Sequence, residues 1–95
     1  MGLEFSGELW YWRGPAPHYF VPVPEEHCAA LKGVAGLVTY GWGTIAVQVR
    51  VGNTEWKTSL FPKDGRYLVP IKAHVQKAEQ LAEGDTVMVR LDVRL

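Results

Sequence analysis

Aromatic and basic side chains are the residues of this sequence best suited to bind a ligand or a partner. Trp10 and Trp12 stand two positions apart in an alternating run, so both side chains fall on one face of a strand. A tryptophan ring can stack on a ligand ring or anchor a protein partner, and a neighbouring arginine adds a polar contact. The sequence therefore predicts an aromatic-basic face made of Trp10, Trp12, Arg13, Arg50, Trp56 and Lys57.

The same tryptophans have a structural interpretation. A small β-barrel needs bulky side chains to fill its interior and cap its ends, and this role is the more common one for any single tryptophan. The basic residues of the strands also stand among acids, which favours a solvated, salt-bridged face over a continuous basic stripe. The basic set is Arg13, Arg50, Lys57, Arg90 and Arg94, and the acids are Glu4, Glu8, Glu55 and Asp92.

Metal-ligating residue types occur together at Glu25-Glu26-His27-Cys28, with His18 and His74 elsewhere in the chain. A structural zinc site needs four converging ligands, commonly paired so that both project from one turn. Adjacent His27 and Cys28 diverge instead by about 100° around a helix. We therefore expect Cys28 to pack as a small hydrophobic side chain, with no metal and no other cofactor bound.

Nucleophilic catalysis finds no support in the motifs. Ser6 and Ser59 lie in strand-like runs that lack the Gly-x-Ser-x-Gly elbow, and no His has an Asp nearby in sequence. The glycine-rich segments 33–36 and 41–43 lack the Gly-Lys-Ser/Thr ending of a phosphate loop, and we interpret both as hinges between helix and strand. The sequence predicts no catalytic residues and a protein that is not an enzyme.

The most regular strand patterns lie in the middle of the chain and near its end. Residues 44–51 alternate apolar and polar side chains with a period of two. Gly52-Asn53 follows at once and tolerates the positive φ of a tight hairpin, so 54–60 should return antiparallel. Residues 85–93 repeat the alternation. The side chains expected to point into one core are Ile45, Val47, Val49, Val87, Val89 and Leu91.

The amino-terminal run 3–12 also alternates, if Gly7 keeps the register or forms a bulge. A turn follows, and residues 19–23 form a short strand in which Pro22 favours an edge position or a point where the chain leaves the sheet. One face of the first run holds Leu3, Phe5, Leu9 and Tyr11, and the other holds Glu4, Glu8, Trp10 and Trp12.

Two short helices are predicted. The first covers 25–32, begins after a proline with two acids in its first turn, and stops at Gly33. The second covers 72–83 and ends at Gly84.

An internal echo bears on the architecture. Phe20-Val21-Pro22-Val23 before the first helix resembles Leu68-Val69-Pro70-Ile71 before the second, and the strands after the helices, 43–47 and 85–89, also resemble each other. Short apolar strands resemble one another easily, so true duplication and coincidence both stay open. Duplication would build a barrel from two interlocked, similar halves.

Length, composition and charge set further limits. Ninety-five residues make a single domain, 1–95, and 47 % hydrophobic residues indicate a folded chain. Ten basic residues balance ten acidic ones, which disfavours nucleic acid as a partner. One cysteine, no leader and no long apolar run predict a reduced cytoplasmic protein that does not span a membrane.

Several short motifs, in this order and spacing, resemble the domain of unknown function 1905 family over almost the whole chain. They are Phe5 through Trp12, Phe20-Val21-x-Val23-Pro24-x-Glu26, the strand 44–51, Trp56-Lys57-Thr58-Ser59-Leu60-Phe61-Pro62, Tyr67-Leu68-Val69-Pro70-Ile71-Lys72 and Gly84-Asp85-Thr86-Val87. The resemblance implies a mainly β fold with two short helices, a double-split β-barrel related to swapped-hairpin transcription regulators and antitoxin amino-terminal domains. The family often has a Trp shortly before the Phe-Val strand, and in this chain His18 and Tyr19 stand in that region.

The function that these observations favour is a non-enzymatic binding or interaction module that uses the aromatic-basic face. Its partner is an unknown protein, a second copy in a homodimer, or a small ligand. The alternative is a DNA-binding transcription regulator or antitoxin-like domain, which depends on kinship of fold alone and which the balanced charge disfavours. A small-molecule enzyme ranks third because it needs a pocket with a perturbed titrating residue.

Overall fold

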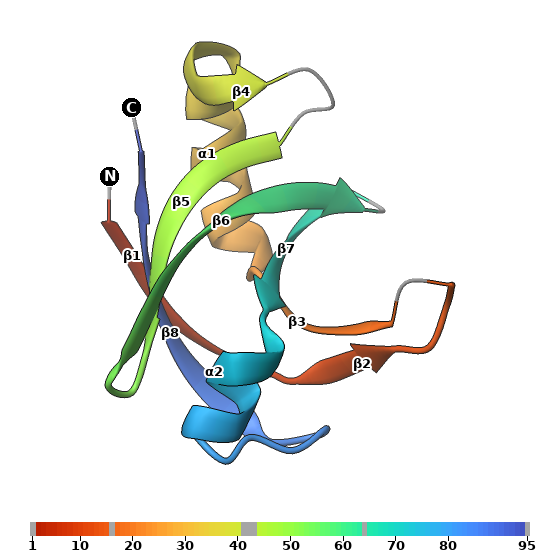
Figure 1. Cartoon of the computed structure of the whole chain (residues 1–95). Helices are drawn as coiled ribbons and strands as arrows, with labels where there is room; N and C mark the ends of the chain where they lie inside the picture. The colour runs from red at the N-terminus through yellow and green to blue at the C-terminus, as the bar shows by residue number, and fades with distance from the viewer. Residues whose placement is uncertain (1, 16, 41–43, 64, 95) are drawn as a thin grey trace.

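The computed structural model describes residues 2–15, 17–40, 44–63 and 65–94, with side chains described for all of these except 34–40 and 44. The domain is mainly β, with one antiparallel sheet that curls into a half-barrel and two short helices (Figure 1). Seven strands follow the order β1-β8-β5-β6-β7-β3-β2, and a short β4 pairs with β5. The elements are β1 (Gly2–Glu8), β2 (Trp10–Trp12), β3 (His18–Pro22), α1 (Glu25–Val38), β4 (Thr39–Tyr40), β5 (Thr44–Val51), β6 (Thr54–Lys63), β7 (Arg66–Ile71), α2 (Ala73–Ala78) and β8 (Thr86–Val93).

The hairpin of β5 and β6 confirms the prediction from the alternating pattern. Gly52 has a φ of 58°, in the left-handed region that glycine adopts without strain, and Val51 lies opposite Thr54. β6 continues past the predicted residue 60 to Lys63, and its last three residues pair with β7. This long strand connects the two parts of the curled sheet.

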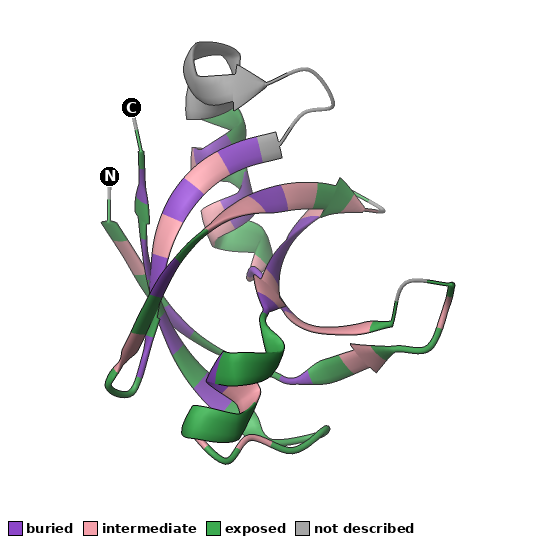
Figure 2. Cartoon of the chain, viewed as in Figure 1, coloured by how far each residue is buried: buried purple, intermediate pink, exposed green. Residues whose placement is uncertain are grey.

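The core lies on the concave side of the sheet. Buried and less buried positions alternate along β5 and β8 (Figure 2), as a period of two requires. All six side chains predicted to share this core are buried, namely Ile45, Val47, Val49, Val87, Val89 and Leu91. Dispersion and exclusion of water from these close-packed side chains stabilise the fold.

Both helices differ in length from the predictions. α1 does not stop at Gly33 but continues to Val38, so segment 33–36 lies inside the helix and is not a hinge. Glycine lowers helix stability by only about 1 kcal/mol relative to alanine, and neighbouring helical residues offset that cost. The other proposed hinge, 41–43, lies outside the described residues.

α2 ends at Ala78, well before the predicted Gly84. The chain turns at Gln80, whose φ is 53°, and the side-chain amide of Gln76 donates to the carbonyl of Leu81. Just past the helix, the Glu79 carboxylate accepts a hydrogen bond of 2.6 Å from the hydroxyl of Thr54 in β6. This link to the β5–β6 hairpin accompanies the early end of α2.

The first alternating run is split into β1 and β2 by the fully buried Leu9. The Leu9 N–H donates to the Asp85 carbonyl, and its own carbonyl accepts from the Gly84 N–H. Gly7 keeps the register, opposite Val87. The predicted faces are confirmed: Phe5 and Leu9 are buried and Leu3 and Tyr11 partly so, whereas Glu4, Glu8, Trp10 and Trp12 are exposed.

Pro22 is the last residue of β3, which confirms it as the point where the chain leaves the sheet. None of the helices in the described part of the chain is long and apolar enough to cross a membrane.

Candidate functional site

An aromatic surface forms on the outer side of the β2–β3 hairpin. Trp10 and Trp12 are 48 % and 39 % exposed, and their cross-strand partners are Phe20 and His18. The rings of His18 and Phe20 lie 6.0 Å apart, and Phe61 of β6 adds a third ring 5.9 Å from His18. We define the aromatic surface by these residues: Trp10, Trp12, His18, Phe20 and Phe61.

Trp12 is the more constrained of the two exposed tryptophans. The Lys63 ammonium lies 3.1 Å from the centroid of its ring, in a cation–π contact from β6. On the turn after β2, a Cβ at Gly14 would overlap the Trp12 indole nitrogen, so only glycine leaves room for the ring there. Trp10 therefore has the more accessible ring of the pair.

The other side of the hairpin is tied to the rest of the domain. The rings of Tyr11 and Tyr19 pack at an angle of 52° with centroids 4.7 Å apart, and the Arg13 guanidinium lies 5.2 Å from the centroid of the Tyr11 ring. Arg13 also donates two hydrogen bonds to Glu83, at 2.8 and 3.3 Å. This hydrogen bonding raises the pKa of Arg13 and lowers the pKa of Glu83. Arg13 thus serves as a tether.

A cleft of about 310 Å³ opens beside Trp10, where β1 passes into β2 and β3 leaves for α1. Its volume lies at the small end of the range for ligand pockets. We call it the Trp10 cleft, and its lining residues are Ser6, Gly7, Glu8, Trp10, Pro22, Pro24 and Arg66.

Arg66 is the positively charged group of this cleft. Its Nε and Nη2 both donate to the carbonyl oxygen of Val23, at 3.3 and 3.0 Å, which fixes the plane of the guanidinium. The side chain is partly buried, and within the described residues it forms no ion pair with an acid. Arg13, Arg50 and Arg90 each have such an ion pair.

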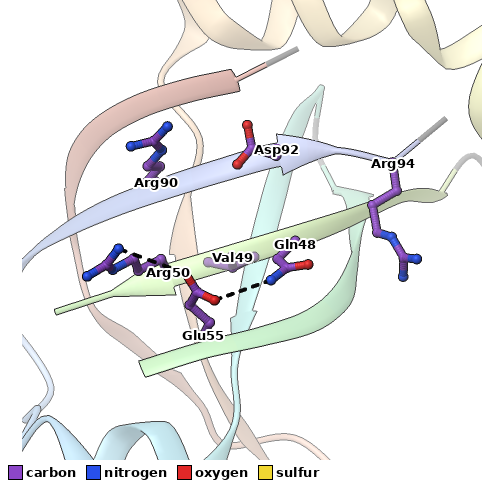
Figure 3. A pocket seen from close by; sticks show the side chains of 7 residues that line it. All are labelled: Gln48, Val49, Arg50, Glu55, Arg90, Asp92 and Arg94. Atoms are coloured by element: carbon purple, nitrogen blue, oxygen red, sulfur yellow. Dashed lines mark hydrogen bonds and ion pairs between the residues drawn. The ribbon is translucent and has the colours of Figure 1, made fainter. Parts of the chain in front are cut away.

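A second hollow, of about 350 Å³, lies on the outer face of β5, β6 and β8 (Figure 3). Arg50 and Arg90 stand directly opposite each other on neighbouring strands. Each forms an ion pair with an acid: Arg50 Nη1 lies 3.9 Å from Glu55 Oε1, and Arg90 Nη1 lies 3.8 Å from Glu4 Oε1. We call this hollow the charged face, and it has the predicted interleaved, salt-bridged arrangement. Its lining residues are Gln48, Val49, Arg50, Glu55, Arg90, Asp92 and Arg94.

The structure does not bring the predicted aromatic-basic residues onto one face. Trp56 is only 6 % exposed and packs in the core, with no hydrogen-bond partner for its Nε1 among the described residues. Arg50 and Lys57 lie on outward positions of β5 and β6, away from the β2 tryptophans. A single face containing all six residues is therefore wrong, because strands paired in one sheet need not share a surface once the sheet curls.

Sequence reasoning missed the two basic residues that do lie by the tryptophans, Lys63 and Arg66. They face each other across the end of the β6–β7 hairpin. The sequence Asp64-Gly65 between them, together with the alternation of 54–60 continued past Leu60, is the signal that could have indicated a hairpin end there.

Of the residues considered for metal binding, Cys28 and His27 have packing roles, whereas Glu25, Glu26 and His74 are exposed. The Cys28 thiol is buried and donates to the Val23 carbonyl, and His27 packs on Phe5 with ring centroids 5.9 Å apart. No group of three or more metal-ligating side chains converges in the parts of the chain that are described. Burial raises the pKa of Tyr67, but this side chain lines neither the Trp10 cleft nor the charged face.

The fold and its surface define a small, β-rich domain with hollows on its outer side. The chain belongs to the family described as Domain of unknown function (DUF1905), which matches residues 5–91. The family resemblance in the sequence motifs is thereby confirmed. No curated protein matches the chain.

Proposed function

We propose that this domain is a non-enzymatic binding module that takes its ligand or partner on the aromatic surface. The observation that carries the proposal is the exposure of Trp10, at 48 %, beside the partly exposed Trp12. Large exposed aromatic rings that lie together are costly in water, and they are the side chains that dominate binding energy when a partner covers them.

The rigidity of the aromatic surface supports the same proposal. Lys63 and Gly14 restrict Trp12, and the hydrogen bonds of Arg13 to Glu83 add an exposed link from the end of β2 to residue 83. A surface already fixed in its binding geometry loses less conformational entropy on association.

We further propose that the half-barrel is a double-split barrel of two similar halves. β3 pairs with β7 with Val21 opposite Val69, and these two residues occupy equivalent places in the sequence echo. β5 pairs with β8 with Val49 opposite Leu91, which are also equivalent when the second echo is extended along the strands. Pairing of each strand with its own counterpart is what a two-fold relation between halves would produce.

The alternative functions have weaker support. A DNA-binding role would need a basic surface, whereas Glu4 and Glu55 stand beside Arg90 and Arg50 on the charged face. An enzyme would need a reactive constellation, and no motif for one occurs in the sequence. A reducing, cytoplasmic location fits the free, buried thiol of Cys28.

Nuclear magnetic resonance of the indole N–H groups tests the binding proposal. The signals of Trp10 and Trp12 are assigned from Trp10→Phe and Trp12→Phe variants of ¹⁵N-labelled protein. We expect the Trp10 signal to move when protein concentration rises or when small aromatic probes (benzyl alcohol, benzoate and benzylamine) are added.

A Met88→Ala variant is the matched control, because Met88 is a large exposed apolar side chain, at 67 %, outside the aromatic surface. It should leave the response of Trp10 unchanged. A Trp10 signal that stays fixed at every concentration and with all three probes would contradict the proposed function.

A further inference from the structure

We infer that the Trp10 cleft binds a small carboxylate ligand with a flat apolar body, with Arg66 pairing to the carboxylate and Trp10 stacking on the flat part. This inference rests on the proposed function, because Trp10 belongs both to the cleft and to the aromatic surface. It goes further by naming the chemical class of the ligand and the residue that selects it.

Arg66 has the properties of a prepared anion-binding group. Two of its nitrogens donate to the Val23 carbonyl, which also accepts from the Cys28 thiol at 3.4 Å, so the guanidinium is anchored to buried backbone. Nη1 makes none of these bonds and keeps its donors for another acceptor. A partly buried cation that forms no ion pair with any described acid gains most from a ligand that supplies the negative charge.

The charge of the cleft favours a single carboxylate over a more highly charged anion. Among the described residues of the lining, Arg66 is the one basic residue, and the carboxylate of Glu8 shares the same space. A phosphate would bring more negative charge against Glu8 with only one guanidinium to compensate. A planar carboxylate matches the fork of a single arginine in a bidentate pair.

The apolar part of the lining favours a flat ligand body. The indole of Trp10 offers an exposed ring face, and Pro22 and Pro24 offer rigid, nonpolar ring surfaces on the other elements of the cleft. Gly7 adds backbone to the lining, and a Cβ there would crowd the buried side chain of Val21 on the inner side of the sheet. A volume of about 310 Å³ suits a ligand of one or two rings.

A comparison of the affinities of three similar probes tests the inference. Benzoate, benzyl alcohol and benzylamine share a phenyl ring and carry negative, zero and positive charge. We expect benzoate to move the Trp10 indole signal and the Arg66 Nε–H signal with a dissociation constant on the order of 1 mM. Benzyl alcohol should bind about tenfold more weakly because it lacks the charge-assisted pair, and benzylamine should be no tighter than benzyl alcohol.

An Arg66→Gln variant should raise the dissociation constant of benzoate to that of benzyl alcohol and leave benzyl alcohol unchanged. Arg94→Gln is the matched control, since it removes the same charge from an exposed position outside the cleft. Glu8→Gln, at an exposed site that tolerates change, should tighten benzoate at least about twofold by removing a like charge. It keeps the test decisive if Arg66→Gln unfolds.

The outcomes separate the two proposals. If benzyl alcohol moves the Trp10 signal but benzoate binds no more tightly, the ligand class is wrong and the binding module stands. If Glu8→Gln weakens benzoate, the carboxylate does not sit at Arg66 and the inference fails. If no probe moves Trp10 and protein concentration has no effect, both proposals fail.

Discussion

Two tryptophans in strands of this domain have opposite surroundings. Trp10 is 48 % exposed, whereas Trp56 is 6 % exposed and lies opposite Val49 inside the curled sheet. The sequence contained a signal for the second, because Trp56 alternates with two charged residues and shares its strand face with Leu60. The packing interpretation therefore holds for Trp56, and among the described residues Trp10 and Trp12 are the surface tryptophans.

Replacing each tryptophan by alanine should separate these roles. Trp56→Ala should lower the free energy of unfolding by about 3–5 kcal/mol, because it removes a buried ring and leaves a cavity. Trp10→Ala should cost about 1 kcal/mol or less and instead reduce ligand or partner binding. Urea denaturation of both variants gives the comparison. Equal losses would show that Trp10 contributes to the core as much as Trp56 does.

Tyr67 makes stability depend on alkaline pH. Burial, with a smaller effect of the nearby Cys28 thiol, raises the pKa of this phenol above its ordinary value of 10.0. Above that pH the unfolded chain releases the Tyr67 proton while the folded chain keeps it, so the free energy of unfolding falls as pH rises. In Tyr67→Phe that fall should be shallower, by up to about 1.4 kcal/mol per pH unit.

Urea titrations between pH 9 and 11 measure this slope, and Tyr11→Phe is the control for a partly exposed tyrosine. Parallel slopes for the parent and Tyr67→Phe would mean that folding does not change the titration of Tyr67.

Among the secondary-structure elements, α1 offers the simplest test of a helix end. Gly33 lies inside α1, and beyond its chain neighbours and its own helix backbone no described atom lies within 4 Å of the place where a Cβ would stand. Gly33→Ala should therefore raise the free energy of unfolding by about 0.5–1 kcal/mol, because alanine loses less entropy in a helix. Thermal and urea unfolding measure the change. A loss of stability would indicate that the helix ends at Gly33 after all.

The sequence predicts elements well where the controlling information is local. The period of two in 44–51, followed by Gly52-Asn53, determined β5, its turn and the start of β6, and 85–93 determined β8 in the same way. The end of α2 was not predictable from its residues alone, because it coincides with a contact from Glu79 to Thr54, 25 positions earlier. Local propensity carries no record of such a contact.

The candidate site was less predictable than the fold for a similar reason. Trp10 and Trp12 were found from their spacing within one strand. Lys63 and Arg66 come from the far end of the β6–β7 hairpin and reach the same region only because the sheet curls. Curvature depends on how all the strands twist and pack together, so a pattern within one strand cannot reveal which residues it brings close.

At the scale of the whole molecule, the distribution of charge disfavours DNA as a partner. Arg50 and Arg90 could meet phosphates only by leaving Glu55 and Glu4, and the chain carries no net charge. We expect no binding to duplex DNA tighter than about 10⁻⁴ M at physiological salt. Fluorescence anisotropy with a labelled duplex measures this. Micromolar affinity that falls steeply with added salt would favour the regulator alternative.

The pairing of β1 with β8 has a consequence for synthesis of the protein in the cell. Gly2 lies opposite Asp92 and Glu8 opposite Thr86, and β8 also fills the place beside β5. A growing chain therefore leaves β1 unpaired and one edge of β5 open until β8 has been made and can insert between them. Strand pairs so far apart in sequence close late in folding, and until they close the open edges of β1 and β5 are exposed to aggregation.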